Sequence, residues 1–585
     1  MPRTHPSLDL SSISRLPAHL RTRATAAASG SSEETLSLLD GLPDIAKRHL
    51  SSLLPVFYAG LDVAPSRISE VLAKFDSSGW SSIQPQIMQV HRCLRGLLYL
   101  AASKVIPRTA SVDIWHNLWP WIEFLDEYDE CLPSDGLPDV VTRYDTFISL
   151  IRFLHDEDND AAARKVIDPT PGLYIVIGRA WRHFILAGHE DGITDVSHFF
   201  ELGKWNSTFH TQDLIIGVGG RANLASTIVS HITHLLPGPD SDVTQQSLFA
   251  LTGTVYMVDN HGDAALKDAL LSSGIITALT TATRTLCRST FPLSRPVLGG
   301  FFSVMVKHIS SYSPALVVES LRAGLLETVF ISPVWLSVFS SCLLFLLKDL
   351  LPGLTVYHSV LMQLQTSLPK VRDRDPAIIG DEALLAHWKS FITLAESRLR
   401  ILNKYNTGAL TRMRVCDNLK CGRNRLKQEL KRCGGCLSAF YCSETCQAND
   451  WRHGGHRHGC HELSLRRDGI GPFYVPSCTA LLYHEFALRR AKIADHHRLF
   501  ALQYPSRPPC IRFDFSTGAC MFQLWPLDDE PLGSDFKFDV ERARRSGGQL
   551  QLHLMKVVHE GDSRFWPFLS YVKSGNLVYG PAASA

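Results

Sequence analysis

The sequence predicts a mainly α-helical array that carries one small cysteine-rich module and ends in a small α+β unit. Three observations lead to this fold class: apolar residues at helical spacing over most of the chain, paired cysteines between residues 416 and 460, and alternating apolar residues after residue 505. The 585 residues can form several domains, and 45% hydrophobic with 20% charged residues is typical of globular proteins. The net charge of +2 gives no general attraction to nucleic acid.

The composition changes along the chain indicate four segments. Residues 1–30 are rich in Ser, Ala and Arg and poor in acidic residues, which predicts a flexible N-terminal arm, with a mitochondrial presequence as the alternative. Residues 31–405 read as an α-helical repeat-like scaffold that begins at a capping box over residues 31–34. Residues 413–460 form the cysteine-rich module, and residues 470–585 form a small α+β domain.

The helical prediction for the scaffold depends on recurring apolar spacing. Four clear amphipathic runs cover residues 83–102, 115–128, 140–154 and 174–186. One of them carries an aromatic stripe, Trp115, Trp119 and Trp121, that could suggest a ligand site. We interpret the stripe as core, because large aromatic side chains at helical spacing bury well.

A faint internal repeat supports an irregular armadillo-like arrangement of these helices. Residues 271–276 and 321–326 share Leu-x-x-Gly followed by two aliphatic residues, 50 residues apart. In armadillo-like repeats a glycine permits the sharp turn between two helices. A compact helical bundle is the alternative.

Two other segments of the scaffold resemble functional motifs. Residues 328–347 contain no charge and are long enough to span a bilayer, but they include Pro333 and four serines, so we interpret them as a buried segment and expect no membrane partner. Residues 217–222 fit the glycine pattern of a dinucleotide site. No second strand follows them, so we interpret the glycines as a turn and expect no small-molecule substrate.

The cysteine-rich module contains eight potential metal ligands in four close pairs. They are Cys416 and Cys421, Cys433 and Cys436, Cys442 and Cys446, and His456 and Cys460. Pairs at this spacing can each hold a tetrahedral Zn²⁺ from one side, so eight ligands fill two structural sites. A disulfide cluster is the alternative, and the absence of a secretion signal and the terminal His-x3-Cys oppose it. We expect two Zn²⁺ per chain as the cofactor.

The residues between these ligands resemble the MYND-type zinc finger, most clearly in the stretch 441–451. The resemblance implies a cross-braced module, with one zinc on Cys416, Cys421, Cys442 and Cys446 and the other on Cys433, Cys436, His456 and Cys460. Two departures are the four residues inside the first pair and one extra residue before His456, where Gly454-Gly455 allows a bulge. His453 and His458 lie close by, and we assign His456 as the ligand.

The same resemblance implies a peptide-binding role. MYND fingers bind short proline-rich peptides of the Pro-x-Leu-x-Pro type, and the family's contact residues correspond here to Gln447 and Trp451. A Gln amide can pair with the main chain of an extended peptide, and a Trp face suits a proline ring. The alternative is structural: Trp451 covers a zinc site and Gln447 caps a turn. We therefore expect protein partners with proline-rich motifs.

We expect no enzymatic activity. MYND fingers also occur in SET-domain lysine methyltransferases, but the Asn-His-Ser-type and Gly-Glu-Glu-x-x-x-Tyr-type motifs of that family are missing here. A nucleic-acid-associated transcriptional regulator is the other alternative, because the loop 422–432 contains five basic residues. No aromatic residue is interleaved with them, so we interpret the loop as solubilising and expect no nucleic-acid partner.

The last segment predicts two β-hairpins, around residues 516–518 and 560–562, with a helix at 535–546 between them. The seven cysteines outside the module lie scattered in apolar surroundings, as expected for free thiols in a reducing compartment. The sequence therefore predicts an intracellular adaptor or scaffold, in the cytoplasm, the nucleus or both, which binds zinc and protein partners.

Overall fold

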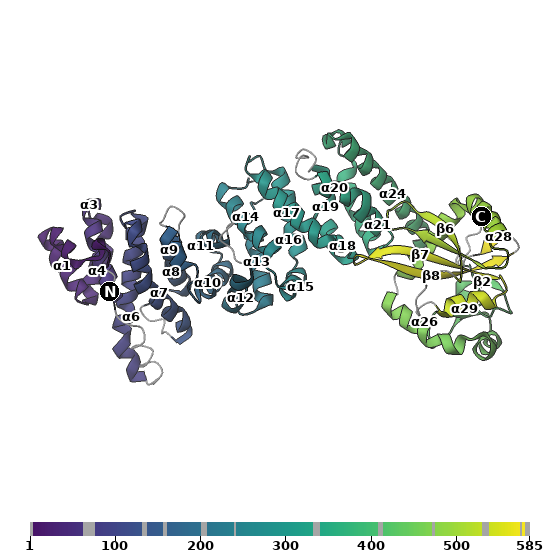
Figure 1. The fold of residues 1–585 in the computed structure, drawn as a ribbon, viewed down its shortest axis with the longest axis horizontal. Coiled ribbons are helices and arrows are strands. Elements are labelled where there is room, and N and C mark those ends of the chain that lie inside the picture. Colours follow the sequence, from purple (N-terminus) through teal and green to yellow (C-terminus); the bar gives the residue numbers. More distant parts are fainter. Residues whose placement is uncertain are drawn as a thin grey trace. The chain divides into compact units, whose positions relative to one another are not determined.

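The fold is described here from a computed structural model of the full chain. The described residues are 4–62, 77–131, 137–155, 161–200, 207–238, 241–331, 340–407, 413–470, 474–528, 537–573 and 576–578. They form two compact units, and the division between the units lies within two consecutive helices, α16 (Ile275–Arg288) and α17 (Ser294–Ile309) (Figure 1). The predicted segments 31–405 and 470–585 therefore do not coincide with the compact units.

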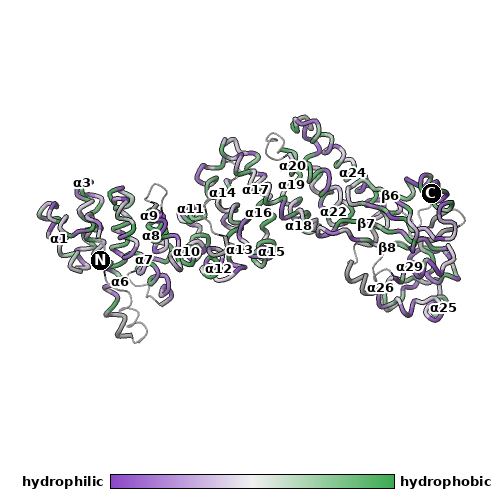
Figure 2. Tube along the Cα trace, in the orientation of Figure 1, coloured by the Kyte–Doolittle hydropathy of each residue, from purple (hydrophilic) through white to green (hydrophobic). Residues whose placement is uncertain are grey.

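The described part of unit 1 is helical. Its helices are α1 (Ala18–Ala28), α2 (Ser32–Gly41), α3 (Lys47–Leu50), α4 (Leu54–Ala59), α6 (Ser77–Ala102), α7 (Ser111–Glu127), α8 (Val140–His155), α9 (Ala161–Ile167), α10 (Leu173–Ala187), α11 (Glu190–Ser197), α12 (Ser207–Gly217), α13 (Arg221–Leu235), α14 (Gln245–Asn260) and α15 (Ala264–Ser272). Hydrophobic and hydrophilic residues alternate along these helices (Figure 2), as amphipathic packing requires.

The N-terminal residues differ from the predicted flexible arm. Residues 4–30 contain two short 3-10 helices, Pro6–Leu8 and Leu10–Arg15, followed by α1. Their apolar side chains are buried, namely Leu8, Ile13, Leu16, Leu20, Ala24 and Ala27. The small alanines that suggest a loose composition allow α1 to pack closely on its neighbours α2 and α4. The prediction of an arm is wrong for these residues, because burial of few but well-spaced apolar residues orders the segment.

Large aromatic residues occupy the core of unit 1. The predicted stripe is buried, with Trp115, Trp119 and Trp121 at 2%, 8% and 0% exposure. Trp121 donates its indole N–H to the carbonyl of Leu61 at 3.0 Å, which satisfies its only polar group. The interpretation of this stripe as core is confirmed.

Several helices begin or end at the capping and glycine residues that the sequence indicates. The hydroxyl of Ser31 accepts the N–H of Glu34 at 3.4 Å and caps α2. Gly217 ends α12, and residues 218–220 form the turn that leads into α13, without a strand. Gly274 and Gly324 have φ of 85° and 111°, and each lies at a junction between two helices. Glycine adopts this left-handed conformation without a steric cost, which explains both turns.

Unit 2 begins with helices and continues through the cysteine-rich module to a sheet. Its helices before the module are α18 (Pro314–Ala323), α19 (Leu325–Ile331), α20 (Ser340–Phe345), α21 (Leu351–Leu354), α22 (His358–Ser367), α23 (Pro369–Arg372) and α24 (Glu382–Asn406). After the module come α27 (Tyr474–Leu488), α28 (Arg490–Gln503) and α29 (Lys537–Arg545). Of the uncharged stretch 328–347, residues 332–339 lie outside the described residues.

A five-stranded sheet closes unit 2. Its strands are β5 (Pro509–Asp514), β6 (Met521–Pro526), β7 (Leu550–His559), β8 (Asp562–Lys573) and β9 (Asn576–Val578), in the order β6-β5-β7-β8-β9. The two predicted hairpins are confirmed as the antiparallel pairs β5–β6 and β7–β8. Strands β5 and β7 are parallel, and α29 lies between them in sequence and covers buried Cys510, Leu552 and Leu554.

Side-chain contacts tie this sheet to the helices of unit 2. Arg398 of α24 is 2% exposed and donates to the carbonyls of Pro352 at 3.1 Å and of Gly518 at 2.7 Å, and to the hydroxyl of Thr355. Tyr357 donates its hydroxyl to the carbonyl of Val558 in β7 at 2.8 Å. The bonds to Gly518 and Val558 join residues 120 and 201 positions apart. The helices before the module and the sheet after it therefore share one core.

The hydropathy and length of the helices are relevant to the prediction that the chain has no membrane partner. Within the described residues, no helix combines the length and the apolar character that crossing a bilayer requires.

Candidate metal centre

Short strands and helices of the module position the eight predicted ligands. The elements are β1 (Met413–Val415), β2 (Asn424–Leu426), β3 (Lys431–Arg432), β4 (Phe440–Tyr441), α25 (Glu444–Asn449), a π-helical turn (Asp450–Gly454) and α26 (His456–Ile470). Both strand pairs, β1–β2 and β3–β4, are antiparallel. Cys416, Cys433 and Cys442 directly follow strands, Cys421 and Cys436 lie in turns, and the remaining three ligands lie near the beginnings of α25 and α26.

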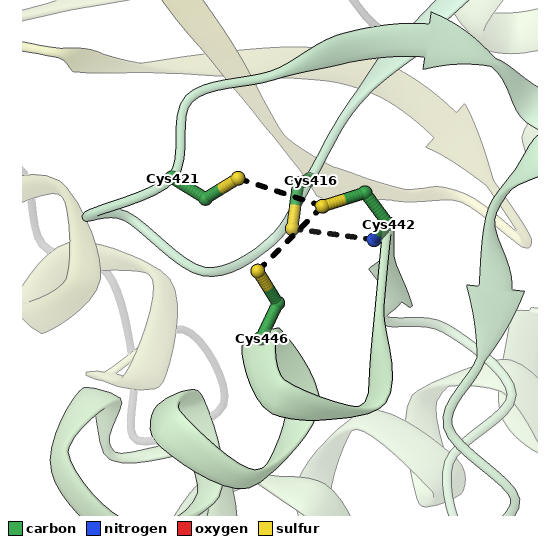
Figure 3. Close-up of side chains that lie close together, drawn as sticks. All are labelled: Cys416, Cys421, Cys442 and Cys446. Carbon is green, nitrogen blue, oxygen red and sulfur yellow. Dashed lines mark hydrogen bonds between the residues drawn. The ribbon is translucent and has the colours of Figure 1, made fainter.

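The first site brings together four thiols from two separate parts of the module, residues 416–421 and residues 442–446 (Figure 3). The sulfur of Cys442 lies 3.5 Å from that of Cys421 and 3.6 Å from that of Cys446, and the sulfur of Cys416 accepts the N–H of Cys442 at 3.5 Å. A tetrahedral zinc with Zn–S bonds of about 2.3 Å holds its sulfurs about 3.8 Å apart. The observed spacing is close to this value.

The second site has three thiols and one imidazole. The Nε2 atom of His456 lies 3.3 Å from the sulfur of Cys433 and 3.7 Å from that of Cys436, and the sulfurs of Cys433 and Cys460 are 3.8 Å apart. A tetrahedral zinc implies about 3.6 Å between a nitrogen and a sulfur ligand. His456 is fully buried, whereas the neighbouring His453 and His458 do not belong to the group of ligand atoms. The structure therefore brings His456 to the site and leaves its two neighbours outside.

Together the two groups fit two zinc ions in the cross-braced pattern. Within each group all four ligand atoms lie within 4.8 Å of one another. The sulfur–sulfur distances are far longer than a disulfide bond of about 2.05 Å, so the disulfide alternative does not fit. The first pair of ligands interleaves with the third and the second with the fourth, so neither site can form without most of the module being folded.

Burial and hydrogen bonds shift the pKa values of the ligand thiols in opposite directions. Burial raises the pKa of Cys460 to about 12 and raises the pKa of Cys416 well above its usual range. A hydrogen bond from the hydroxyl of Ser443 lowers the pKa of Cys446 to about 7. Thiolates at the buried positions therefore depend on the positive charge of a bound ion, and metal binding should release protons.

Residues around the ligands hold them in place. Ser443 caps α25 and accepts the N–H of Cys446 at 3.2 Å. Asp417 accepts the N–H of Phe440 at 2.7 Å, which joins the first ligand loop to β4. Tyr441 is fully buried and donates its hydroxyl to Asp450 at 2.7 Å. These contacts, which sequence reasoning did not identify, tie the ligand loops to β4, to α25 and to the π-helical turn.

A π-helical turn and a left-handed glycine accommodate the extra residue before His456. Asp450–Gly454 form a π-helical turn, and Gly455 has φ of 86°, a left-handed value that suits glycine. A Cβ atom on Gly454 would lie 1.9 Å from the carboxylate of Asp450. A larger residue at either position would be strained in this backbone conformation or would clash with Asp450.

Helix α29 of the C-terminal segment packs directly on the module. Arg542 is 6% exposed and lies 3.3 Å from the carboxylate of Asp417, and it also donates to the carbonyl of Asp417. The ring of Phe538 rests on Gly459, one residue before the last ligand. The metal centre and the C-terminal sheet are therefore coupled through one helix, although 125 residues separate Arg542 from Asp417.

Replacing Gly459 with Ala tests this coupling. Alanine normally stabilises a helix relative to glycine, but a Cβ atom here would lie 2.1 Å from the ring of Phe538. We expect Gly459→Ala to weaken the docking of α29 by about 1–3 kcal/mol, measured as faster amide hydrogen exchange in residues 537–545. Gly434→Ala is the matched control, because nothing lies within 4 Å of its Cβ position. Unchanged exchange in Gly459→Ala would contradict the packing described.

Most cations of the basic loop 422–432 have partners within the module. Arg425 lies 3.9 Å from Glu429, and Lys431 lies 2.7 Å from Glu444. Lys427 and Arg432 lie over the ring of Phe440, at 5.5 and 5.3 Å from its centroid. These four cations therefore contribute to contacts within the module.

Two interleaved sites, one with four cysteine ligands and one with three cysteines and a histidine, define a cross-braced zinc finger. The family model of the MYND finger matches residues 416–460, so this segment is a MYND finger. Neither a search of curated proteins nor a search of solved structures returned a match for the chain.

The two predicted peptide-contact residues lie four positions apart in consecutive helical segments of the finger. Gln447 lies in α25 and is half-buried, and Trp451 lies in the π-helical turn before His456 and is 40% exposed. The Trp451 ring lies 5.7 Å from the ring of His456. The residue thus packs beside a zinc ligand and still presents part of its face to solvent.

Proposed function

We propose that this chain is a non-enzymatic, zinc-dependent interaction protein whose MYND finger binds short proline-rich peptides. The observation that carries the proposal is the exposed face of Trp451, near the half-buried Gln447, on a finger whose two zinc sites hold both residues in place. Within the described residues, neither the Gln447 amide nor the Trp451 indole has a hydrogen-bond partner. These groups can bond a peptide without breaking an existing contact.

The physical roles of the two residues differ. The Gln447 amide can donate to and accept from the main chain of an extended peptide, which contributes affinity with little sequence preference. The Trp451 ring offers a flat apolar surface on which a proline ring packs with little loss of conformational entropy, because both groups are rigid. A few anchor contacts of this kind give micromolar affinity, or about −8 kcal/mol.

Peptide titration tests the proposal on the full chain. We expect a fluorescein-labelled Pro-x-Leu-x-Pro peptide to bind with micromolar affinity, Trp451→Ala to weaken binding about tenfold or more, and Gln447→Ala to weaken it less. Anisotropy measures binding, and metal analysis confirms two zincs in each variant.

Trp525→Ala is the matched control, because Trp525 is also 40% exposed but lies in β6. A peptide with its prolines replaced by alanines should not bind. If binding is absent at millimolar peptide, or is equally weak in both tryptophan variants, then Trp451 serves only to cover the zinc site.

We further propose that the helices of the chain form a scaffold of irregular armadillo-like character that acts inside the cell, in the cytoplasm, the nucleus or both. The glycine junctions at Gly274 and Gly324 support a repeated helix-turn-helix unit. Zinc–thiolate sites and scattered free cysteines suit a reducing compartment.

A further inference from the structure

A groove of about 830 Å³ lies within unit 2, away from the finger, between α24 and the segment formed by α22 and α23. Its floor is apolar and well packed. Phe330, Leu368, Val371 and Trp388 line it and are each less than 10% exposed. Phe330 and Trp388 meet edge to face, with ring centroids 5.4 Å apart. A rigid apolar floor of this kind suits a ligand with apolar side chains.

The groove follows one face of α24 for about four turns. The residues of α24 that line it are Trp388, Lys389, Ile392, Thr393, Glu396, Leu399, Arg400 and Asn403. Helical residues three or four apart lie on the same face, so this set forms a continuous stripe. At a rise of about 1.5 Å per residue, the stripe is about 22 Å long. A segment of about four helical turns matches this length.

The rim of the groove is basic. Arg372, Arg374, Lys389 and Arg400 line it, against one carboxylate, Glu396. Arg372 bonds Glu396 at 3.0 Å in an exposed pair, and Arg374 lies 3.6 Å from Glu327. Glu327 does not line the groove and is shared with two further arginines, Arg284 and Arg288. The lining thus keeps an excess of positive charge.

Two of these cations have no acidic partner within the described part of the chain. They are Lys389 and Arg400, both exposed. They are eleven residues apart, which is close to three full helical turns, so both project along the same side of α24, about 16 Å apart. They flank the half-buried side chains of Ile392 and Leu399. An apolar strip with a cation near each end is complementary to an acidic amphipathic helix.

We propose that this groove docks an acidic, amphipathic helical segment of a partner protein. Apolar side chains of the segment rest on Trp388, Ile392 and Leu399, and its carboxylates pair with Lys389 and Arg400. A nucleic acid would meet the same cations but has no aliphatic side chains for the apolar floor. This docking site is separate from the finger, so it stands or fails independently of proline-rich peptide binding.

Peptide selection on the full chain tests the proposal. A display library of random peptides of about four helical turns, or about 16 residues, is selected on the immobilised wild-type protein. We expect enrichment of sequences with apolar residues at i, i+3 or i+4, and i+7, and with Asp or Glu between them. The synthetic form of the leading peptide is then titrated by fluorescence anisotropy.

Two double variants of equal charge change provide the comparison. In Lys389→Glu/Arg400→Glu the groove cations are reversed, and we expect affinity for the selected peptide to fall about tenfold or more. Lys370→Glu/Lys404→Glu is the control, because both lysines are exposed near the groove but do not line it. Its affinity should stay within about twofold of wild type. Equal melting temperatures and zinc contents confirm that both variants fold.

Four results would overturn the proposal. The first is a selection that enriches no sequence, or enriches neutral or basic sequences. The second is an equal loss of peptide affinity in the two double variants, and the third is loss of peptide binding in Trp451→Ala. The fourth is a single-stranded RNA of similar length that binds to the groove cations as tightly as the peptide does. The third would place the peptide on the finger, and the fourth would identify a site for polyanions in general.

Discussion

Removal of zinc should unfold the MYND finger and release α29 from it, while the helices of unit 1 stay folded. Each structural zinc contributes about 10–16 kcal/mol of apparent folding energy in isolated fingers, which is more than the few apolar residues of so small a module can replace. The purified chain should contain two zincs. After treatment with a chelator, hydrogen exchange should become fast in residues 416–460 and also in residues 537–545.

The release of α29 follows from its contacts. Arg542 is buried against Asp417, and Phe538 rests on Gly459, so both lose their partners when the ligand loops unfold. A buried guanidinium without its carboxylate is strongly destabilising, by about 3–5 kcal/mol. The helix should then separate from the finger, although it contains none of the metal ligands.

Single cysteine variants sharpen this test. Cys442→Ala should lose at least one zinc and show the same pattern of fast exchange. Cys342→Ala is the control, because Cys342 is also half-buried but lies in α20, outside both sites. It should retain two zincs. A zinc content of one or none in the wild-type protein would contradict the two-site assignment. So would amide hydrogen exchange in residues 416–460 that stays the same after treatment with the chelator.

Replacement of Arg398 should give the second largest effect. Arg398→Met keeps a similar apolar length but removes the donors to the carbonyls of Pro352 and Gly518 and to the hydroxyl of Thr355. Hydrogen bonds from a charged group contribute about 1.5–3 kcal/mol each, and the acceptors left behind are buried. We expect a local loss of about 3–5 kcal/mol at the junction between α24 and the β5–β6 hairpin.

The environment of Arg398 explains why another cation cannot replace it. Burial lowers the pKa of its guanidinium to about 10, so it stays charged at neutral pH. Its planar fork reaches two acceptors in and directly after α21, Pro352 and Thr355, and a third between β5 and β6, Gly518. The group also lies 5.5 Å from the centroid of the Phe515 ring. An ammonium group is a point charge with a different geometry, so Arg398→Lys should also destabilise the junction.

Amide hydrogen exchange in residues 509–526 measures this effect, because global unfolding of a chain with two compact units is not a single transition. Lys404→Met, on the same helix and exposed, is the control and should leave exchange in the hairpin unchanged. If the amides of residues 509–526 exchange at the same rates in Arg398→Met and in Lys404→Met, then apolar packing alone holds the sheet against the helices of unit 2.

These contacts change how the finger should be viewed. A MYND finger that covers only residues 416–460 could be an independently folded module within a flexible chain. Here the buried Arg542 and Arg398 link the finger, the sheet and α24 within one unit. Peptide binding at Trp451 and helix docking along α24 would therefore occur on surfaces of the same compact unit.

Local patterns in the sequence predicted much of the fold. The eight zinc ligands are recognisable because the pairs are close in sequence, and Zn²⁺ requires few residue types at short spacing. Helical periodicity and the two hairpins are equally local, because side-chain direction repeats about every 3.6 or every two residues. The buried aromatic stripe of α7 and the glycine junctions at Gly274 and Gly324 were predictable for the same reason.

By itself, therefore, the sequence determined the zinc chemistry, the cross-braced assignment by resemblance, and the type of most helices and strands. Only the tertiary structure showed that residues 4–30 are helical and packed, that Arg542 and Arg398 bind backbone 125 and 120 residues away, and that α22–α24 enclose a basic groove. The physical reason is that burial and long-range hydrogen bonds depend on which distant segments meet. The spacing of residues within one segment does not indicate which distant segments come into contact. Metal-ligand pairs and helical periodicity, in contrast, are patterns among residues that are close in sequence.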